Sequence, residues 1–468
     1  MEEKIIIEDR ILSPDECLPD TDRLLTLIKE RKYTEFQRLV SDIPAVDIAE
    51  FFDGMPKEYY ALAYRLLPKE VAAEAFVEMG SELKEHLINS FTDSELSATL
   101  EELYIDDTVD IIEEMPAAVV KRILRNSSGE DRDVINRLLK YPKDTAGTIM
   151  TTEYVRFTKE MTVEDALRHV RRVAIDRETI YTCYVTDKKR RLIGIVTAKE
   201  LLISPLDTKL EAIMEESVIF VGTLDDKEEV ANKFDKYGFL ALPVVDNEGR
   251  LVGIVTVDDA IGVIREEAEE DFAKMAAITP SESAYLKTSA FSIWKARIPW
   301  LLLLMISATF SSAILGRFES ALPSVLLLFV PMLMDTGGNC GGQASVTVIR
   351  AISVGEARLS DFARILWKET RVGVACGVTL GAVAFIKVVL IDRLLMNNGE
   401  VTVGVALSVA FAVLLTIITA KLIGSMLPIL AKRVGLDPAV MASPFITTLV
   451  DAISLLLYFF ISAQFLGL

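Results

Sequence analysis

Five long apolar stretches occupy the second half of the chain. They run over about 293–315, 322–349, 372–391, 401–430 and 444–467. Each offers the roughly 20 apolar residues that a helix needs to cross the hydrocarbon core of a bilayer. In lipid, backbone N–H and C=O groups must find their partners within the protein, so such stretches fold as helices. The sequence therefore predicts a five-helix α transmembrane domain over 291–468, embedded in a lipid bilayer.

The charges between these stretches orient them in the membrane. One set of loops carries nine basic residues, namely Lys295, Arg297, Arg350, Arg358, Arg364, Lys368, Arg371, Lys432 and Arg433. The opposite loops carry Arg317 and Arg393. Because short basic loops stay in the cytoplasm, we expect a cytoplasmic N-terminus and an external C-terminus. A buried core of helices in a soluble protein would not show this alternation of loop charge.

The part of the chain that precedes the spans is acidic. Of the 50 basic and 69 acidic residues, 13 and 9 lie from Phe291 onward, which leaves 37 and 60 in 1–290, a net charge of −23. Nucleic-acid binding depends on clustered Lys and Arg side chains. We therefore expect no nucleic-acid partner.

Residues that carry catalysis or bind soft metals are scarce. The four cysteines, Cys17, Cys183, Cys340 and Cys376, form no Cys-x-x-Cys pair, which argues against a disulfide framework and against a zinc site. The chain has two histidines and no His-Glu-x-x-His motif, phosphate-binding loop or nucleophile elbow. We expect that the protein is not an enzyme.

The second apolar stretch carries polar residues at membrane depth. It contains the sequence PMLMDTGGNCGGQ over 331–343. Close packing between helices explains the four glycines. It does not explain Asp335, Asn339 and Gln343 together, because polar side chains in lipid are costly unless they face a cavity or a partner. This segment is therefore predicted to line a pore or a site.

The fifth apolar stretch carries a polar face. Its members recur at spacings of three and four residues, as on one side of a helix: Thr447, Thr448, Asp451, Ser454 and Tyr458. A lone carboxylate on such a face indicates a path for cations. The alternative is a structural ion pair of Asp451 with Lys421 of the fourth stretch. A twofold dimer would bring two copies of Asp451 together.

The segment 1–140 is predicted to be an all-α helical-repeat N-terminal domain, in which phrases such as DIAEFFDGMP and DIIEEMP recur.

The segment 141–262 has a clearer repeat: IGIVT over 193–197 returns as VGIVT over 252–256, and Ile149-Met150 returns as Ile213-Met214. It resembles a tandem pair of α/β CBS domains, one over about 141–204 and one over about 205–262. In such domains a Thr followed three residues later by Asp binds nucleotides. Thr256 and Asp259 match this pattern, so the resemblance implies ATP there, whereas Thr197 is followed by Glu200.

The segment 257–290 is predicted to begin as an acidic linker helix, VDDAIGVIREEAEEDFAK, that leads to the membrane. A solvated helix face is one interpretation of such a charge run. Divalent cations that bridge repelling carboxylates provide the other.

Three motifs, in this order of domains, make the chain similar to the MgtE family of magnesium channels or transporters. They are YPKDTAG over 141–147, the GGNxGxQ core of the second span, and DPA over 437–439 followed by Pro444, Thr447-Thr448 and Asp451. The resemblance covers essentially the whole chain. It implies a homodimer in the prokaryotic cytoplasmic membrane that takes Mg2+ as substrate and as regulator.

The resemblance also implies particular residues. In the pore, Mg2+ would be held by Asp451 with Thr447, Thr448 and Asn339. In the cytosolic sensor, Mg2+ would be held by Asp106, Asp110, Asp226, Glu228, Asp259, Glu267, Glu270 and Asp271. Cytosolic Mg2+ would close the pore through the linker helix, and Mg2+ would enter down its electrochemical gradient. The alternatives are a transporter of another divalent cation, Co2+ or Mn2+, and a CBS membrane sensor that conducts nothing.

Overall fold

The structure is a computed structural model that describes residues 21–41, 43–280, 285, 288–319, 323–441 and 443–466. Cys17, the first residue of the predicted second span and the last residue of the predicted fifth span lie outside the described residues. The chain divides into two compact units, 1–264 and 265–468. Each unit is described by itself.

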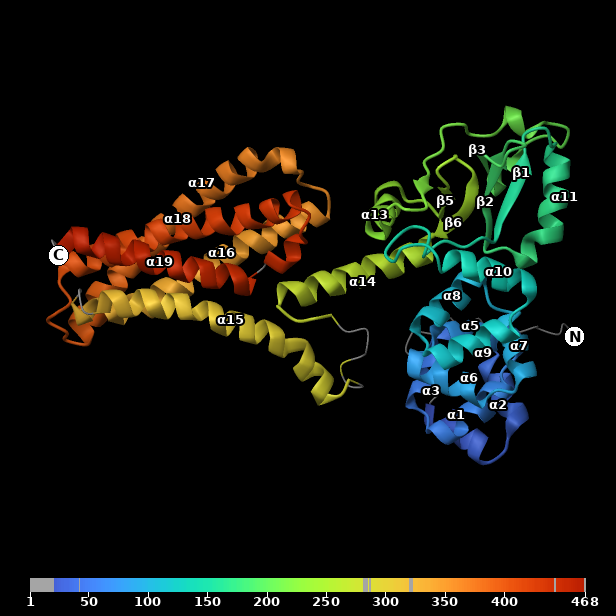
Figure 1. Ribbon diagram of the computed structural model, residues 1–468, viewed down its shortest axis with the longest axis horizontal. Helices are drawn as coiled ribbons and strands as arrows, with labels where there is room; N and C mark the ends of the chain where they lie inside the picture. Colours follow the sequence, from blue (N-terminus) through green and yellow to red (C-terminus); the bar gives the residue numbers. More distant parts are fainter. Residues whose placement is uncertain are drawn as a thin grey trace, which may run out of the picture. The chain divides into compact units, whose positions relative to one another are not determined.

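The first unit begins with a domain of short helices (Figure 1). They are α1 (Thr21–Lys29), α2 (Tyr33–Val40), α3 (Ala45–Gly54), α4 (Tyr60–Leu66), α5 (Lys69–Glu78), α6 (Ser81–Ser90), α7 (Asp93–Leu100), α8 (Ile105–Glu114), α9 (Ala117–Asn126) and α10 (Gly129–Leu138). Pro44, Pro68 and Pro116 stand immediately before α3, α5 and α9, where proline starts a helix without losing a hydrogen bond. Phe36, Phe52 and Phe76 fill the core. The predicted helical domain is confirmed.

Two small sheets with the same topology follow. The first has β1 (Tyr154–Thr158), β2 (Thr179–Thr186) and β3 (Leu192–Thr197), and the second has β4 (Val221–Gly222), β5 (Ala241–Val245) and β6 (Leu251–Thr256). In each sheet the first pair of strands is parallel and the second pair is antiparallel. The helices of this region are α11 (Val163–Val173), α12 (Ala198–Ile203), α13 (Lys227–Tyr237) and α14 (Val257–Met275). The repeat predicted from the sequence is therefore a repeat of structure.

The two repeats pair with each other through residues that lie in or next to the repeated sequence motifs. The segment that enters the first repeat pairs with β6 of the second, where Thr151 and Ile254 exchange backbone hydrogen bonds of 2.8 and 2.9 Å. The segment that enters the second repeat pairs in the same way with β3 of the first, through Ile195 and Glu215 at 3.0 and 2.9 Å.

At each of these crossings, a methionine side chain packs against a glycine. A Cβ atom at Gly253 would lie 2.7 Å from the sulfur of Met150, and one at Gly194 would lie 2.9 Å from the sulfur of Met214. Only glycine leaves room for the crossing strand.

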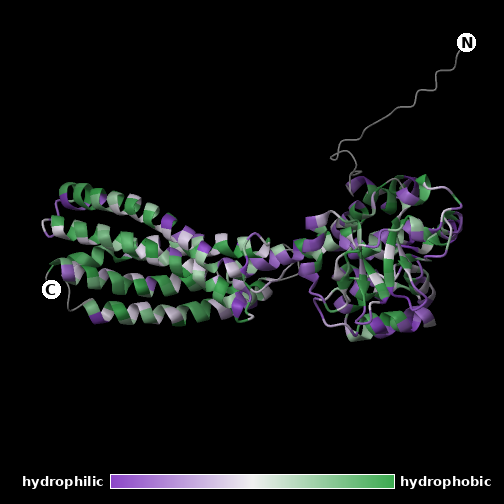
Figure 2. Ribbon diagram, turned by 90° about the horizontal axis from the view of Figure 1, so that it is seen from above, coloured by the Kyte–Doolittle hydropathy of each residue, from purple (hydrophilic) through white to green (hydrophobic). Residues whose placement is uncertain are grey.

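Among the described residues of the second unit, five helices are long and apolar enough to cross a membrane. They are α15 (Ala290–Glu319), α16 (Val330–Ser353), α17 (Phe362–Lys387), α18 (Val403–Arg433) and α19 (Ser443–Leu466). A π-helical segment, Val388–Leu395, continues α17, and short 3-10 turns, Ser324–Phe329 and Pro438–Met441, precede α16 and α19. Apolar residues cover these helices along most of their length (Figure 2). The five predicted spans are confirmed as helices, whereas the domain boundaries along the chain stay a prediction.

Candidate functional site

Helices α16 and α19 approach each other closely through glycine. A Cβ atom at Gly338 would lie 2.7 Å from Cγ2 of Thr447, and one at Gly337 would lie 2.9 Å from the hydroxyl of Ser454. Because Gly337 and Gly338 carry no side chain, the polar edge of α16 lies beside that of α19.

The polar residues of α16 form one exposed stripe. Asp335, Asn339, Gln343 and Thr347 follow one another at intervals of four residues, and all four are exposed in the chain, while the positions between them are largely buried. The hydroxyl of Thr347 donates to the carbonyl oxygen of Gln343 at 2.7 Å. We call these four residues the polar stripe. In a helix of a membrane span, such a stripe indicates contact with water or with another protein surface rather than with lipid.

Asp451 lies on α19 at the edge of this region. Its Oδ1 is buried and has no hydrogen-bond partner among the described residues. Asp335 is close enough for the two carboxylates to repel each other. Among the described residues no ion pair joins Asp451 to Lys421, so the structural pair that the sequence left open is not formed. An unpaired carboxylate at this depth favours a cation as its partner.

The predicted polar face of α19 is only half open. Thr447, Thr448 and Asp451 are partly exposed, but Ser454 and Tyr458 are buried. The Tyr458 hydroxyl donates to the carbonyl oxygen of Leu326 at 2.8 Å. The C-terminal half of the face therefore packs the helix, and the N-terminal half remains available for a site.

Lys421 lies on another side of α16. Lys421 is buried on α18. A Cβ atom placed on Gly373 of α17 would lie 3.5 Å from the Cβ of Lys421. Its charge acts on Cys340, which is buried on α16. Lys421 thus belongs to the packing of α16, α17 and α18.

In the first unit, the fold brings Asp106 and Asp110 of α8 together with Asp259 of α14. Asp106 and Asp259 repel each other, and both act on Asp110. Four further carboxylates that the sequence analysis did not select act on these residues or on one another: Asp107, Glu153, Glu178 and Asp258. We call the seven residues the acidic cluster.

The register of the first sheet explains two members of the acidic cluster. Glu153 and Glu178 immediately precede β1 and β2, which are parallel and pair Tyr154 with Thr179. The backbone N–H of Glu178 donates to the carbonyl oxygen of Glu153 at 3.0 Å. Parallel strands begin at the same edge of a sheet, so the two residues lie side by side at that edge. The Glu153 carboxylate also accepts from the N–H of Ile105, the first residue of α8, at 3.2 Å.

Burial followed by mutual repulsion makes these carboxylates hard to ionise. The pKa of Asp106 is raised to about 6, that of Glu153 to about 7 and that of Glu178 to about 8. Burial likewise raises the pKa of Asp259 to about 7, against the hydrogen bond from Thr256, which lowers it. Within the described part of the chain, one oxygen of Asp106 and one of Glu178 are buried without a hydrogen-bond partner.

Asp110 differs because much of it faces solvent. Partial loss of hydration around its carboxyl group, followed by repulsion from Asp106 and Asp259, raises the pKa of this group. In the part of the chain that the structure describes, no group of three His, Cys, Asp or Glu side chains converges to hold a metal ion directly. A cation in the acidic cluster would therefore be held through its water shell.

The other predicted sensor residues lie elsewhere. Asp226 caps α13, where its Oδ1 accepts from the N–H of Glu228 at 2.8 Å. No hydrogen bond or ion pair among the described residues links Asp226 to the acidic cluster. Glu267, Glu270 and Asp271 lie on the part of α14 that belongs to the second unit.

The predicted nucleotide residues are in contact. The Thr256 hydroxyl donates to Asp259 Oδ2 at 2.6 Å. At the equivalent place in the first repeat, Glu200 accepts from the N–H of Thr197 at 2.7 Å and closes a helix cap. Asp259 is thus shared between the acidic cluster and the predicted nucleotide site.

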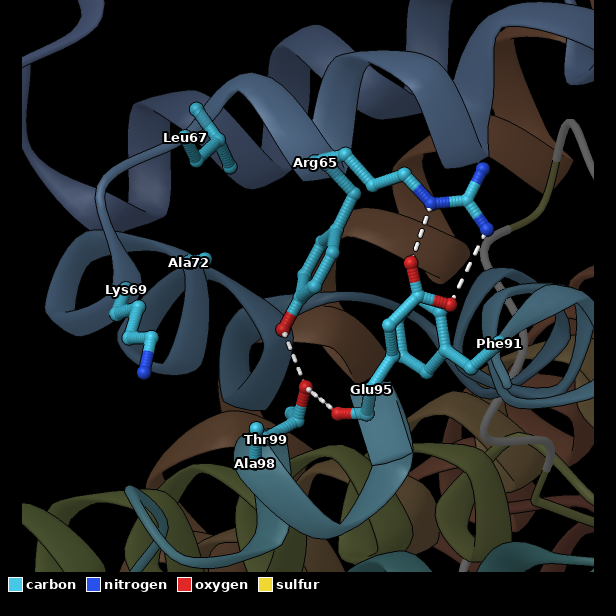
Figure 3. Close-up of a pocket in the computed structure, with 9 residues that line it drawn as sticks. Arg65, Leu67, Lys69, Ala72, Phe91, Glu95, Ala98 and Thr99 are labelled. Carbon is cyan, nitrogen blue, oxygen red and sulfur yellow. Dashed lines mark hydrogen bonds and ion pairs between the residues drawn. The ribbon is translucent and has the colours of Figure 1, made fainter. Parts of the chain in front are cut away.

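The helical domain has a cavity of its own (Figure 3). It measures about 400 Å³, and Arg65 and Glu95 on its wall form an ion pair of 2.6 Å. The Tyr64 and Thr99 hydroxyls lie 3.4 Å apart. These groups satisfy one another, so the cavity offers no surplus charge to a cation.

Family models match three parts of the chain. A divalent cation transporter model, MgtE, matches residues 330–461, the MgtE intracellular N domain matches 43–144, and the CBS domain matches 146–206 and 210–266. The magnesium transporter MgtE of Thermus thermophilus is 35% identical over 436 residues, which cover 92% of this chain and 95% of that protein. The chain belongs to the MgtE family. The magnesium transporter MgtE of Bacillus subtilis is 31% identical over 446 residues, with 95% and 97% covered.

Solved structures agree with the MgtE assignment. A crystal structure of the cytosolic domain of the Mg2+ channel MgtE in complex with ATP is 36% identical, with a TM-score of 0.50, and covers 52% of this chain and 100% of that one. The soluble part of a magnesium transporter is 32% identical, with a TM-score of 0.50, and covers 53% and 98%. The helical domain, CBS pair and five apolar helices are therefore those of an MgtE-family membrane protein with a cytoplasmic N-terminal region.

Proposed function

We propose that this chain is a Mg2+-selective channel that imports Mg2+ down its electrochemical gradient. Its relatives in Thermus thermophilus and Bacillus subtilis are named magnesium transporters. The observation that carries the proposal is the polar stripe beside Asp451, whose buried oxygen has no partner in the described chain. A sensor that conducts nothing would have no use for this arrangement at membrane depth.

The pore of this channel is formed by a homodimer. A single chain exposes the polar stripe on the outside of α16, and lipid would not solvate it. A twofold partner covers the stripe and brings a second Asp451 to the same path. The basic loops keep the N-terminus in the cytoplasm, so five spans place the C-terminus outside.

Asp451, Thr447, Thr448 and Asn339 recognise the ion through its water. Mg2+ dehydrates reluctantly and is usually bound by one or two carboxylates with several waters retained. The partly exposed Thr447 and Thr448 and the exposed Asn339 offer hydroxyl and amide oxygens to such waters. This oxygen-only set suits Mg2+ better than Co2+, whereas Mn2+ accepts the same ligands and is separated from Mg2+ by the competition assay below.

Cytosolic Mg2+ closes the channel. In the acidic cluster, Asp106, Asp110 and Asp259 bind hydrated Mg2+, and Glu153 and Glu178 add charge to the same place. Further sensor residues are Asp226, Glu228, Glu267, Glu270 and Asp271, of which Glu270 is paired with Lys274 and Asp271 with Ser353. Mg2+ that binds the closed form more tightly than the open form shifts the population toward closure.

ATP binds at the second CBS repeat, through Thr256 and Asp259. The support is the contact between these two side chains and the cytosolic MgtE domain solved with ATP. Calorimetric titration of the full-length protein with ATP tests this placement, and the absence of binding heat would contradict it.

Replacement of Asp451 tests the pore. In proteoliposomes, Asp451→Asn should lower Mg2+ flux at least about tenfold, because a fixed charge at membrane depth is lost. The matched control is Glu356→Gln, which removes an exposed carboxylate from a loop and should leave flux unchanged. Competition with Mn2+ and Co2+ in the same assay identifies the ion. Normal flux in a dimeric Asp451→Asn protein would contradict the assignment.

A further inference from the structure

The end of α14 carries a lysine between two carboxylates. The Lys274 Nζ lies 2.6 Å from Glu270 on the same helix and 2.7 Å from Asp437 on the chain that connects α18 to α19. The Lys274 side chain is 24% exposed and that of Asp437 is 32% exposed. The ammonium group is thus held at short range on two sides and is largely withdrawn from solvent.

Asp437 stands at the entrance to the helix that carries Asp451. Its Oδ1 accepts from the backbone N–H of Ala439 at 2.8 Å, within the 3-10 turn that precedes α19. The carboxylate therefore orders this turn and binds Lys274 at the same time. A displacement of Lys274 would therefore move the beginning of α19.

A second contact joins the same end of α14 to α16. The hydroxyl of Ser353, the last residue of α16, donates to Asp271 Oδ2 at 3.3 Å. The last two turns of α14 thus contact the cytoplasmic ends of α16 and α19. These are the two helices that carry the polar stripe and Asp451.

The charges around Lys274 favour this arrangement. Partial burial works against its ammonium form, but the hydrogen bonds to Asp437 and Glu270 outweigh burial and raise the pKa of Lys274. Burial and repulsion from Asp437 raise the pKa of Asp271. Three carboxylates therefore surround one ammonium group, and its removal would leave them to repel one another.

We propose that Lys274 is a positioning residue, a tethered cation that fastens the end of α14 to the turn before α19 without any metal ion. The inference rests on the proposed function. A covalently attached ammonium holds this joint at every Mg2+ concentration, so Lys274 transmits the closing movement but does not itself sense the ion. Sensing is then left to carboxylates such as those of the acidic cluster.

Full-length variants in proteoliposomes test the inference with two readouts. The first is Mg2+ flux as a function of Mg2+ on the cytosolic side, and the second is Mg2+-dependent protection of the cytosolic region from protease. Lys274→Met should raise the Mg2+ concentration for half-closure by about tenfold or more, because coupling is lost. Protease protection should keep its wild-type Mg2+ dependence. Lys274→Arg, which keeps the charge, should behave as wild type in both readouts.

A charge exchange provides the decisive control. Lys274→Asp and Asp437→Lys should each impair closure, and the double variant should recover it, because the pair is restored with reversed polarity. If Lys274→Met does not yield a folded dimer, the charge exchange tests the inference instead. Recovery of Mg2+-dependent closure in the double variant supports the inference, and a folded double variant that does not close overturns it. A Lys274→Met closing curve equal to that of wild type also overturns it. Wild-type protein that conducts no Mg2+ overturns the proposed function as well.

Discussion

Glu178 is a carboxylate whose surroundings favour its protonated form. It immediately precedes β2, one of its oxygens is buried without a hydrogen-bond partner among the described residues, and burial with repulsion from Asp106 and Asp258 raises its pKa to about 8. In the unfolded chain it ionises near its ordinary value of 4.5. The folded state therefore binds the proton more tightly, and the stability that Glu178 provides is lost as the pH rises from about 4.5 through 8.

Glu178→Gln should remove the loss of stability that wild type shows as the pH rises. Without Mg2+ at pH 8, the variant should protect the β1–β2 region by about 1–2 kcal/mol more than wild type, after discount for partial exposure. At pH 5 the difference should be much smaller. Added Mg2+ should stabilise wild type more than the variant, because the ion takes the place of the proton. Hydrogen exchange of the full-length protein, corrected for the intrinsic effect of pH, measures each of these differences.

Glu58→Gln serves as the control, because Glu58 is exposed and outside the acidic cluster. It should leave both the pH dependence and the Mg2+ response unchanged. Equal pH dependence in wild type and Glu178→Gln would contradict the assigned environment.

Part of the acidic cluster could be predicted from the sequence. Asp106 and Asp110 are four positions apart, so a helix must place them on one face. Glu153 and Glu178 could not be found in this way, because their proximity depends on the parallel pairing of β1 with β2. Lys274 and Asp437 are also far apart along the chain, and only tertiary packing brings them together.

At the scale of elements, α16 is held by contacts that leave almost no space. A Cβ atom at Gly424 of α18 would strike the carbonyl oxygen of Gly341. A Cβ at Gly341 itself would lie 3.0 Å from Cγ2 of Ile446 on α19 and 3.3 Å from the carbonyl oxygen of Ala420 on α18. The position of the polar stripe thus depends on glycines in two helices.

Gly424→Ala should force α18 away from α16. A backbone carbonyl cannot rotate aside as a side chain can, so overpacking here should cost about 1–3 kcal/mol. We expect a lower midpoint of thermal unfolding in detergent and reduced Mg2+ flux. Gly316→Ala on α15 is the matched control, because a Cβ there would meet nothing within 4 Å. A Gly424→Ala protein as stable and active as the control would show that the helices can separate at no cost.

The apolar stretches predicted the helices of this unit but not the use of each face. On α19 the spacing placed Ser454 and Tyr458 on the face of Asp451. Their burial follows from neighbours that spacing does not reveal, namely Gly337 on α16 and the 3-10 turn before it. Composition predicts membrane insertion, whereas the division between pore and packing depends on which helix lies opposite.

At the scale of the whole molecule, the proposed homodimer places a second chain over the polar stripe. In a background without the native cysteines, Asn339→Cys should form a cross-linked dimer with a short bifunctional maleimide, because the twofold partner covers this edge. Val378→Cys on α17, where the native side chain is 54% exposed and apolar, should not cross-link. Electrophoresis without reductant and native mass spectrometry measure the outcome. A monomeric mass with no cross-linked product at position 339 would contradict the homodimer.

The crossed packing of Met150 on Gly253 and Met214 on Gly194 has a consequence for the history of the chain. Each repeat completes its fold with a strand-like segment borrowed from the other, so neither repeat is self-sufficient. An ancestor with one repeat would have needed a second copy of itself to supply that segment. Gene duplication and fusion would then have turned a contact between two molecules into a contact within one. The fused pair was afterwards free to diverge, with glutamate at position 200 in one repeat and aspartate at 259 in the other.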